Sequence, residues 1–457
     1  MKSFNKLTIL GAAMICAASA SAQTSASGYF LEDYTYRFQL NPAFGNSRSF
    51  VAMPGLGNLN VGLTGNLDLQ DVIYTINGKT TTFLNPGVNT QEFLSNISDK
   101  NRLQVNLHEQ VLATGFNAFG GYNTISISAR ADVGVSLPYS IFSLLKEGAQ
   151  NQTYDIADIN ANASAWAEVA FGHSRDINEE WRVGGTFKFL LGAGKVDADF
   201  RNASLTLGTD SWTVTTDADL RASMKGLTFK HDLNDRTNHT YVNGVDIDGA
   251  GIGGYGAAFD FGAVYKPKAL KDWTFSLAVL DLGFINWSNT MLASTNGVQT
   301  VNTDGYVFNV DDDASNSFEN EWDRLRDDIS AIYELNDMGD EGARSAMLAA
   351  TINAGVEYTF PLYRKLSFGL LNSTRVNGKF TTTDFRLSAN VAPVKCFNAS
   401  VNVCGGTNAV GFGWLMNLHV TGFNFYLGMD RTIGKMSKQA VPLRSNAQVN
   451  LGMNFLF

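Results

Sequence analysis

Two histidines flanked by aspartates are the strongest candidates for metal binding in this sequence. His231 and His239 lie in the segment KHDLNDRTNH, together with Asp232 and Asp235. Imidazole nitrogens and carboxylate oxygens are typical zinc ligands. The spacing of these four residues matches none of the usual metal-site patterns, and we therefore predict no metal.

A different histidine has the right chemistry for a catalytic base. In GFGWLMNLHV, Asn417 and His419 are two positions apart, so they would share one face of a strand. Acyl transfer also needs a nucleophile, and the chain has no G-x-S-x-G segment. A hydrogen bond inside the fold is the favoured interpretation, although a Ser or Asp within reach of His419 would revive the catalytic one. We predict that the protein is not an enzyme.

The remaining chemical signals are one glycine run and two acidic runs. GAGIGG (249–254) has the glycine spacing of a dinucleotide-binding loop, but an alternating strand follows where that loop needs a helix. The runs DIDG (246–249) and DDD (311–313) have the acids that begin a calcium loop, yet their twelfth residues are Ala257 and Trp322 instead of Glu. We expect solvated loop acids, with loose cation binding as the alternative, and no cofactor.

The N-terminus has the features of a secretion signal. Two lysines precede a short apolar stretch at residues 7–20, and the small residues Ala20 and Ala22 mark a cleavage site. The stretch is too short for a membrane span of ~20 residues, so we predict a cleaved signal peptide over 1–22. Cleavage would change the net charge from −9 to 32 − 43 = −11, which argues against nucleic acid as a partner.

Most of the remaining chain alternates between apolar and polar residues, as a β-strand does. In ISISARADVGVSL (125–137), for example, every second residue is apolar. Several runs are longer than the five to six residues typical of soluble strands, and they suit a membrane strand of about 9–11. We predict an all-β fold, a transmembrane antiparallel β-barrel, with a soluble β-sandwich as the alternative.

The alternating runs exceed the number of strands that we expect in the barrel. Because single-chain bacterial barrels close with an even number of strands, some runs must merge or lie in loops, and we predict about 14 strands, within 14–16. The seventeen runs are 59–66, 104–117, 122–136, 163–175, 180–193, 196–208, 211–223, 254–266, 273–285, 300–309, 348–360, 365–374, 381–391, 397–404, 410–420, 421–430 and 448–457.

The polar faces of these runs are rich in small residues and carry single charges. This composition is typical of a crowded barrel lumen, where charges pair across the interior. The predicted lumen charges are Arg130, Asp132, Glu168, Lys188, Asp260 and Arg386. The assignment depends on strict alternation, so one β-bulge would reverse the face of every residue beyond it.

The connections between runs and the C-terminus also indicate an outer-membrane barrel. Short turns alternate with long polar loops, of which 225–251 and 288–346 are the longest, and we expect the short turns in the periplasm and the long loops outside the cell. Residues 317–335 read as an amphipathic helix within the second loop. The alternating C-terminal strand ends on Phe455 and Phe457, which resembles the signal that barrel-assembly machinery recognises.

Three segments carry a family resemblance. RFQLNPAF (37–44) resembles the Asn-Pro-Ala segment of FadL-like channels for hydrophobic compounds. FGAVYKPKALKDWTFSLAVLDLGFINWSN (261–289) and GFNFYLGMD (422–430) resemble an uncharacterised outer-membrane barrel family of the Bacteroidota, a domain of unknown function. That family is distantly similar to the PorV and PorP/SprF barrels of secretion and gliding.

We divide the chain into three parts: the signal peptide (1–22), an N-terminal segment (23–56) and the barrel (57–457). The resemblance to FadL-like channels implies that the N-terminal segment folds inward as a hatch. From the FadL-like channels, only Asn41, Pro42 and Ala43 are carried over, as part of this hatch.

Two functions from different classes remain open. The first is a FadL-like conduit for small hydrophobic molecules, which a gap in the wall beside the hatch would favour. The second is a structural or scaffolding barrel in a surface secretion or gliding assembly, which a filled lumen and exposed apolar loops would favour. The expected location is the outer membrane of a Gram-negative bacterium. The expected partners are outer-membrane lipid and lipopolysaccharide, barrel-assembly machinery, and either a hydrophobic ligand or a surface protein.

Overall fold

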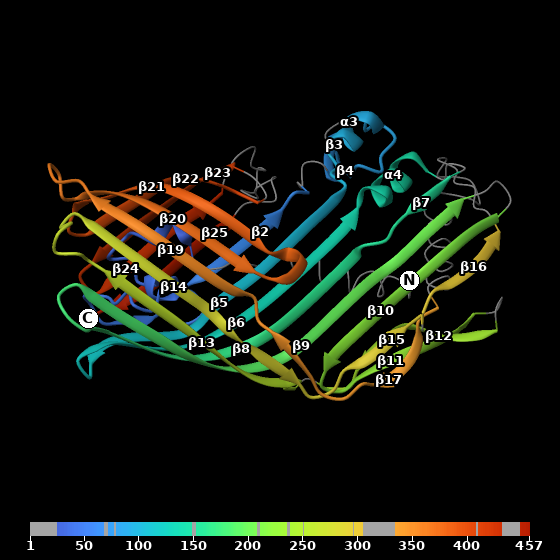
Figure 1. Cartoon of the computed structure of the whole chain (residues 1–457), viewed down its shortest axis with the longest axis horizontal. Helices are drawn as coiled ribbons and strands as arrows, with labels where there is room; N and C mark the ends of the chain where they lie inside the picture. Colours follow the sequence, from blue (N-terminus) through green and yellow to red (C-terminus); the bar gives the residue numbers. More distant parts are fainter. Residues whose placement is uncertain are drawn as a thin grey trace.

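The computed structural model describes residues 25–67, 72–76, 79–148, 152–207, 211–234, 238–249, 251–295, 297–304, 334–407, 410–431 and 448–457. The signal peptide predicted over 1–22 and almost all of the helix predicted over 317–335 lie outside these residues. The molecule is elongated, with a barrel at one end and a curved sheet that continues from the barrel wall at the other (Figure 1).

In the described part of the chain, fourteen strands close into an antiparallel barrel. The first strand position is shared by β1 (Phe50–Ala52) and β2 (Leu59–Gly65), which pair with β5 on one side and with the last strand, β25, on the other. Because this pairing leaves no open edge, the predicted barrel of about 14 strands is confirmed. The other strands are β5 (Lys100–Ala118), β6 (Gly121–Pro138), β8 (Ile159–Asp176), β9 (Trp181–Leu207), β13 (Gly254–Tyr265), β14 (Trp273–Trp287), β19 (Ala350–Thr359), β20 (Leu366–Val376), β21 (Thr382–Val394), β22 (Phe397–Gly406), β23 (Val410–Val420), β24 (Phe423–Asp430) and β25 (Gln448–Leu456).

Three differences reduce the seventeen predicted runs to fourteen barrel strands. The runs at 180–193 and 196–208 are one continuous strand, β9. The other two surplus runs form β10 (Ser211–Met224) and β16 (Gln299–Asp304), which pair with each other outside the barrel. β10 also pairs with the distal part of β9, so the barrel wall continues into this outer sheet.

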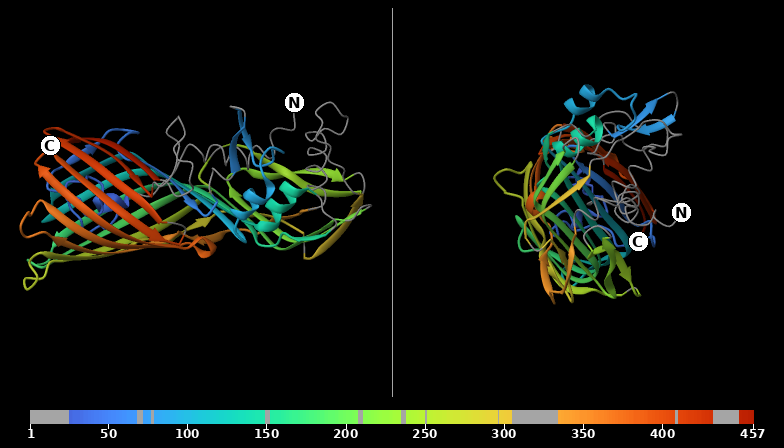
Figure 2. Two further views of the ribbon diagram at one scale, coloured as in Figure 1. Left: turned by 90° about the horizontal axis from the view of Figure 1, so that it is seen from above. Right: turned by 90° about the vertical axis from the view of Figure 1, so that its right-hand side faces the viewer.

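We call the sheet beyond the barrel the extension, and it lies at the end with the long connections (Figure 2). It contains the distal part of β9, β10 and β16 with β7 (Thr153–Asp155), β15 (Met291–Ser294), β17 (Asn336–Asp340) and β18 (Arg344–Met347). The hairpins β3 (Ile73–Ile76)–β4 (Lys79–Thr82) and β11 (Leu227–Asn234)–β12 (His239–Ile247), and the helices α3 (Thr90–Ser95) and α4 (Tyr139–Glu147), lie at this end too (Figure 1). Short turns join the barrel strands at the opposite end, which we call the turn end.

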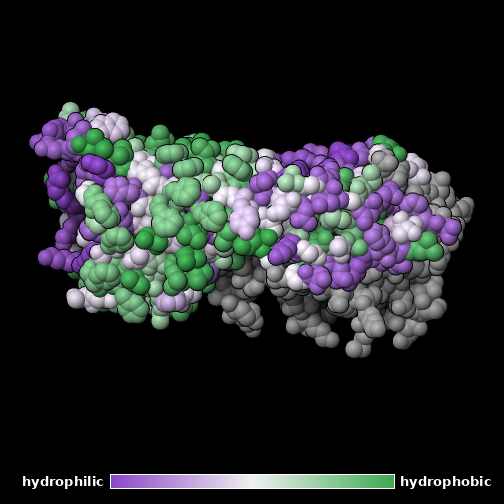
Figure 3. All heavy atoms as spheres, turned by 90° about the horizontal axis from the view of Figure 1, so that it is seen from below, coloured by the Kyte–Doolittle hydropathy of each residue, from purple (hydrophilic) through white to green (hydrophobic). Residues whose placement is uncertain are grey.

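The outer face of the barrel carries an apolar belt. Phe187, Phe261, Leu370, Leu387 and Phe412 are all between 42% and 63% exposed, although they are large and apolar. On the face drawn in Figure 3, apolar residues cover the barrel half and hydrophilic residues cover most of the extension. A soluble protein rarely exposes so large an apolar surface, whereas outer-membrane barrels present one to lipid.

Aromatic pairs lie where the belt meets the turn end. The rings of Trp181 and Tyr265 stack with their centroids 4.5 Å apart, and those of Trp273 and Tyr358 are 4.9 Å apart. Aromatic girdles flank the apolar band of outer-membrane barrels at the membrane–water interface. Among the described residues, the structure has no helix that is both long and apolar enough to cross a membrane.

Candidate functional site: a filled barrel lumen

Residues 25–49 lie inside the barrel, and we call them the plug. The plug contains two short 3-10 turns, η1 (Ala26–Gly28) and η2 (Arg37–Gln39). Its aromatic side chains form one buried cluster with the wall, in which the ring of Tyr34 lies 4.9 Å from that of Tyr426. The cluster includes Tyr29, Phe30, Tyr34, Tyr36, Phe38 and Phe44 from the plug and Phe50, Tyr122, Leu371, Leu415 and Tyr426 from the wall. The plug is therefore packed against the wall as a protein core, not as a loose segment.

Asp430 on β24 holds the beginning of the plug. Its carboxylate accepts hydrogen bonds from the backbone N–H of Ala26 at 2.9 Å and of Ser27 at 3.1 Å, and from both serine hydroxyls nearby. Arg386 on β21 donates to the same carboxylate at 3.0 Å. Asp430 is fully buried, so these donors replace the water that its charge would otherwise need.

The Asn-Pro-Ala segment lies against β9, β13 and β14. The side-chain amide of Asn41 donates to two wall carbonyls, at 3.3 and 3.4 Å, and its oxygen accepts from the backbone N–H of Ala43 at 2.9 Å. Arg182 donates to the carbonyl of Ala43 at 2.8 Å. The wall presents Gly184 and Gly262 here, and a Cβ on either would collide with the plug. Two strand glycines thus let the plug approach the wall closely.

Four of the six charges predicted for the lumen, Arg130, Glu168, Lys188 and Asp260, meet in one network across β6, β8, β9, β13 and β14. Arg130 donates to Glu168 at 3.1 Å and, through two nitrogens, to Asp281 at 2.8 and 2.9 Å. The ammonium of Lys188 lies 2.6 Å from Asp281 and 2.8 Å from Asp260. All five side chains are at most 10% exposed, so the two cations and three carboxylates compensate one another in a buried site.

Asp281 is the member of this network that alternation misses. Leu277 is outward-facing and 54% exposed, so strict alternation would turn Asp281 outward as well. A β-bulge opposite Asp260 gives Asp281 a φ of 58°, and both Leu280 and Asp281 face inward. Beyond the bulge the faces are exchanged, and Leu282 is outward. An acid in the apolar run LAVLDLGF is the signal that could have indicated the bulge.

The other two predicted lumen charges lie in separate ion pairs. Asp132 accepts from Arg375 at 2.7 Å, and Arg386 pairs with Asp430. Sequence reasoning did not select Arg375 or Asp430, although Asp430 continues the inward alternation of β24 at its last position. Both are at most 6% exposed.

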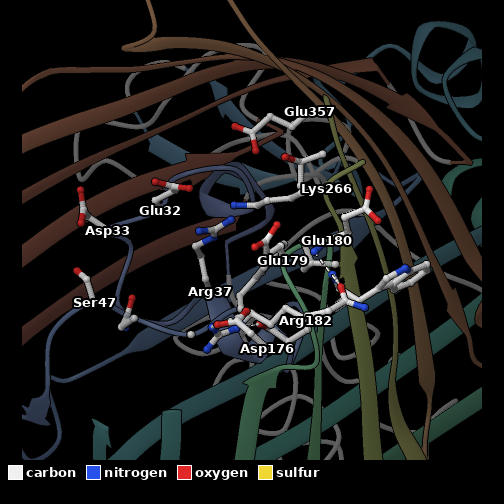
Figure 4. A pocket seen from close by; sticks show the side chains of 18 of the residues that line it. Glu32, Asp33, Arg37, Ser47, Asp176, Glu179, Glu180, Arg182, Lys266 and Glu357 are labelled. Carbon is white, nitrogen blue, oxygen red and sulfur yellow. Dashed lines mark hydrogen bonds and ion pairs between the residues drawn. The ribbon is translucent and has the colours of Figure 1, made fainter. Parts of the chain in front are cut away.

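Two cavities border the plug. The first, of about 80 Å³, lies between the plug and the charge network and is lined by both apolar and charged side chains. The second, of about 910 Å³, opens at the turn end, and we call it the vestibule. Figure 4 shows Glu32 and Arg37 of the plug facing Lys266 and Glu357 of the wall across the vestibule. Acids outnumber bases in its lining, so it differs from the mostly apolar pockets that bind apolar ligands.

A second charge network stiffens the extension. Asp219 on β10 accepts from Ser294 at 2.7 Å and from Arg221 at 3.0 Å, and it also pairs with Arg201 on β9. Burial raises the pKa of the Asp219 carboxyl, but hydrogen bonds from these three side chains outweigh it and lower the pKa to about 2. Asp219 therefore links β9, β10 and β15 through charge-assisted hydrogen bonds.

The histidines singled out from the sequence are not brought together. His231 lies 3.0 Å from Asp337, and His239 lies 3.2 Å from Glu334. In the part of the chain that the structure describes, no group of three or more His, Cys, Asp or Glu residues is arranged to hold a metal.

His419 lies beside an acid of the plug. Its Nε2 is 3.4 Å from the carboxylate of Asp33, and Asn417 donates to the backbone carbonyl of Asp33 at 3.0 Å. The catalytic interpretation required a Ser or Asp within reach of His419, and Asp33 meets this condition. Among the described contacts of His419, however, there is no serine or cysteine that could act as a nucleophile. The pair of His419 and Asp33 joins the plug to β23.

The C-terminal aromatics lie on the outer face of the barrel. Phe455 is 49% and Phe457 is 72% exposed, and Phe455 contacts Phe423 with ring centroids 6.5 Å apart. Recognition of these residues by the assembly machinery stays a prediction.

Comparisons with known proteins identify one protein family and three solved structures of similar fold. No curated protein matches the sequence. The toluene transporter TodX of Pseudomonas putida is similar at a TM-score of 0.40 and 7% identity, over 96% of this chain and 95% of that one. A FadL homologue of Pseudomonas aeruginosa gives 0.31 and 9%, over 96% and 95%. The translocator domain of the autotransporter NalP of Neisseria meningitidis gives 0.32 and 9%, over 100% of both chains.

These scores and identities are too low to bear on function. The family model, in contrast, matches residues 42–430, which span the barrel from the Asn-Pro-Ala segment to the aspartate that holds the plug. The chain belongs to the family of unknown function DUF5723.

Proposed function

We propose that this protein is a closed outer-membrane barrel that acts as a scaffold and holds its extension outside the cell for a surface partner. The observation that carries the proposal is the length of β9, which has 27 residues. At roughly 3.3 Å per residue such a strand is about 90 Å long, whereas a membrane strand needs only about 9–11 residues. More than half of β9 therefore serves the extension.

The pairing of β9 marks the division between the two parts. From Trp181 to Gly192 it pairs with β13 within the barrel, and from Gly194 to Leu207 it pairs with β10 in the extension. The barrel strand β8 continues beside β9 as far as Phe200, and β6 pairs with that part of β8 as far as Ser136, so the wall runs into the extension without a hinge loop. A barrel that is closed by a plug and continues into a rigid outer sheet suits a structural role better than passage of molecules through the lumen.

The surface of the extension supports the same proposal. It exposes large apolar side chains away from the apolar belt, including Val298 and Met338, which are 61% and 46% exposed. Contiguous apolar patches rimmed by polar residues mark protein-binding surfaces, and we propose that these side chains contribute to one. We place the turn end in the periplasm and the extension outside, since short turns are periplasmic in this class of barrel. The resemblance to the PorV and PorP/SprF barrels stays a prediction.

A gated conduit for small hydrophobic molecules is the second candidate, and the vestibule favours it. A volume of about 910 Å³ leads from the turn end to the plug, and the plug is a terminal segment that could move without breaking the wall. The strained bulge at Asp281 also lies beside the inner cavity. Against this candidate, the route is blocked by an aromatic core and lined by charges.

Photocrosslinking in whole cells would separate the two candidates. A photoreactive residue would replace Met338 or Val298 in the extension, and Leu387 on the apolar belt would serve as the matched control. The scaffold predicts a discrete crosslinked protein from the extension and none from the belt. No crosslink from the extension, together with uptake of an apolar fluorescent probe that depends on the protein, would instead support the conduit.

A further inference from the structure

Three consecutive turns at the turn end carry a cluster of cations. The turns join β13 to β14, β19 to β20 and β21 to β22, which are neighbours around the barrel. Among the described residues of these turns, Asp272 is the only acid. The cations Lys268, Lys271, Arg364, Lys365 and Lys395 are all exposed, and we call this cluster the basic rim; the sixth cation of these turns, Lys266, lines the vestibule.

Contacts between the turns make the rim one continuous surface. Arg364 donates to Asp272 of the preceding turn at 2.8 Å. Lys365 donates to the carbonyl of Pro393, beside the following turn, at 2.7 Å. The rim is therefore held as a unit by hydrogen bonds, although its side chains extend into solvent.

The rim lies at the level where the barrel leaves the apolar belt. Trp273, which is 38% exposed, directly follows the first turn and contacts Tyr358 of the aromatic girdle. Between the cations, the turns expose Leu362, Leu270 and Val394, which are 89%, 50% and 53% exposed. Exposed apolar side chains among cations, next to an aromatic girdle, are typical of surfaces that bind a membrane interface.

The other turns show that this charge belongs to one sector. The turns at 119–120 and 421–422 have no charged residue, and the turn at 177–180 contains Glu179 and Glu180. Lys268 pairs with Glu179 at 2.6 Å, so the acidic turn offsets one charge of the rim, which keeps a net positive charge.

We infer that the basic rim binds the headgroups of anionic phospholipids in the leaflet that it faces. Lys and Arg next to a bilayer are attracted to anionic headgroups, and a cluster of four to eight suffices for recognition. The apolar side chains between the cations favour a lipid surface over an acidic protein, because they would reach the edge of the acyl chains. The inference rests on the proposed insertion of the barrel in a membrane.

Fluorescence quenching by brominated lipids tests this inference directly. The full chain would be reconstituted in phosphatidylcholine vesicles that contain a fixed fraction of either brominated phosphatidylglycerol or brominated phosphatidylcholine. The signal of Trp273 is obtained by difference from the variant Trp273→Phe. We expect the anionic lipid to quench Trp273 more strongly, and we expect this preference to weaken as salt is added.

A matched pair of variants assigns the preference to the rim. The rim variant carries Lys268→Gln, Lys271→Gln, Arg364→Gln and Lys395→Gln. The control carries Lys225→Gln, Lys230→Gln, Arg344→Gln and Lys379→Gln, which are exposed cations of the extension side. The preference should vanish in the rim variant and persist in the control.

Each other outcome has a definite meaning. Equal quenching by the two lipids in the unmodified protein, or a preference that survives in the rim variant, would overturn the inference. Quenching by neither lipid would instead show that the barrel is not inserted, which would refute the proposed function. Heat-modifiable migration on a gel verifies that each variant is folded.

Discussion

Replacing Lys188 with methionine should destabilise the protein far more than the same replacement at Lys100. Both lysines form ion pairs, and methionine keeps most of the aliphatic stem while removing the charge. The side chain of Lys188 is 9% exposed and lies within 2.8 Å of two aspartates. The side chain of Lys100 is 56% exposed and pairs with Asp158, which is 54% exposed. The comparison isolates the effect of burial on a pair of the same chemistry.

The structure sets the size of the expected effect. Two cations and three carboxylates give the network a formal charge of 2 − 3 = −1, and Lys188→Met changes it to 1 − 3 = −2. Removing one partner of a buried ion pair costs about 3–5 kcal/mol, because the remaining charge is left uncompensated. Removing one partner of an exposed pair costs about 0–1 kcal/mol. Adding Asp260→Asn to Lys188→Met should restore part of the loss, since it removes one unpaired carboxylate.

Urea unfolding in lipid vesicles, followed by tryptophan fluorescence, measures these differences. The double-mutant cycle of Lys188 and Asp260 gives their coupling free energy directly. Equal losses of stability for Lys188→Met and Lys100→Met would refute the buried network. The network would also be refuted if Asp260→Asn destabilised the Lys188→Met variant as much as it destabilises the unmodified protein.

Three further predictions concern the plug and the extension. Gly184→Ala should lower the free energy of unfolding by about 1–3 kcal/mol, because the new methyl group collides with the plug backbone. Gly185→Ala should be tolerated, since a Cβ there makes ordinary contacts, and urea unfolding compares the two variants. Asp430→Ala should cost about 3–5 kcal/mol in the same assay, because it leaves Arg386 buried without its counter-ion. Because the pKa of Asp219 is lowered in the folded protein, its carboxylate stabilises the extension above the unfolded pKa of about 4, and this contribution should be lost as the pH falls towards 2. Asp219→Asn should remove that part of the pH dependence of unfolding, which unfolding measurements from about pH 6 to 2 would detect.

Alternation predicts the barrel wall well because lipid outside and a crowded lumen inside impose opposite demands on successive residues. Arg130 and Lys188 stand in runs whose neighbours face outward, and both are buried in the network. The same reasoning fails at Asp281, where one extra residue in the strand exchanges the two faces. Bulges depend on local hydrogen bonding between strands, which a single sequence does not reveal.

Alternation predicts strands in the extension but not where those strands lie. Beyond Gly192 the alternation of β9 continues, with Val196, Ala198 and Phe200 set between charged residues. Two glycines, Gly192 and Gly194, interrupt the pattern, so the sequence suggests two short strands where the structure has one long strand. The plug is a similar case, because the Asn-Pro-Ala segment suggests a hatch, but its attachment depends on wall residues such as Asp430 and Gly184 that are remote in sequence.

Planar-bilayer conductance of the reconstituted protein tests the central claim, that the plug closes the barrel. The comparison is between the mature chain and a variant that lacks residues 25–46. The deletion stops there because Ser49 bonds to Phe457 and β1 pairs with β25, and both contacts close the wall. We predict no steady conductance from the mature chain and a steady channel from the deletion variant. Equal, steady conductance from both proteins would contradict the claim.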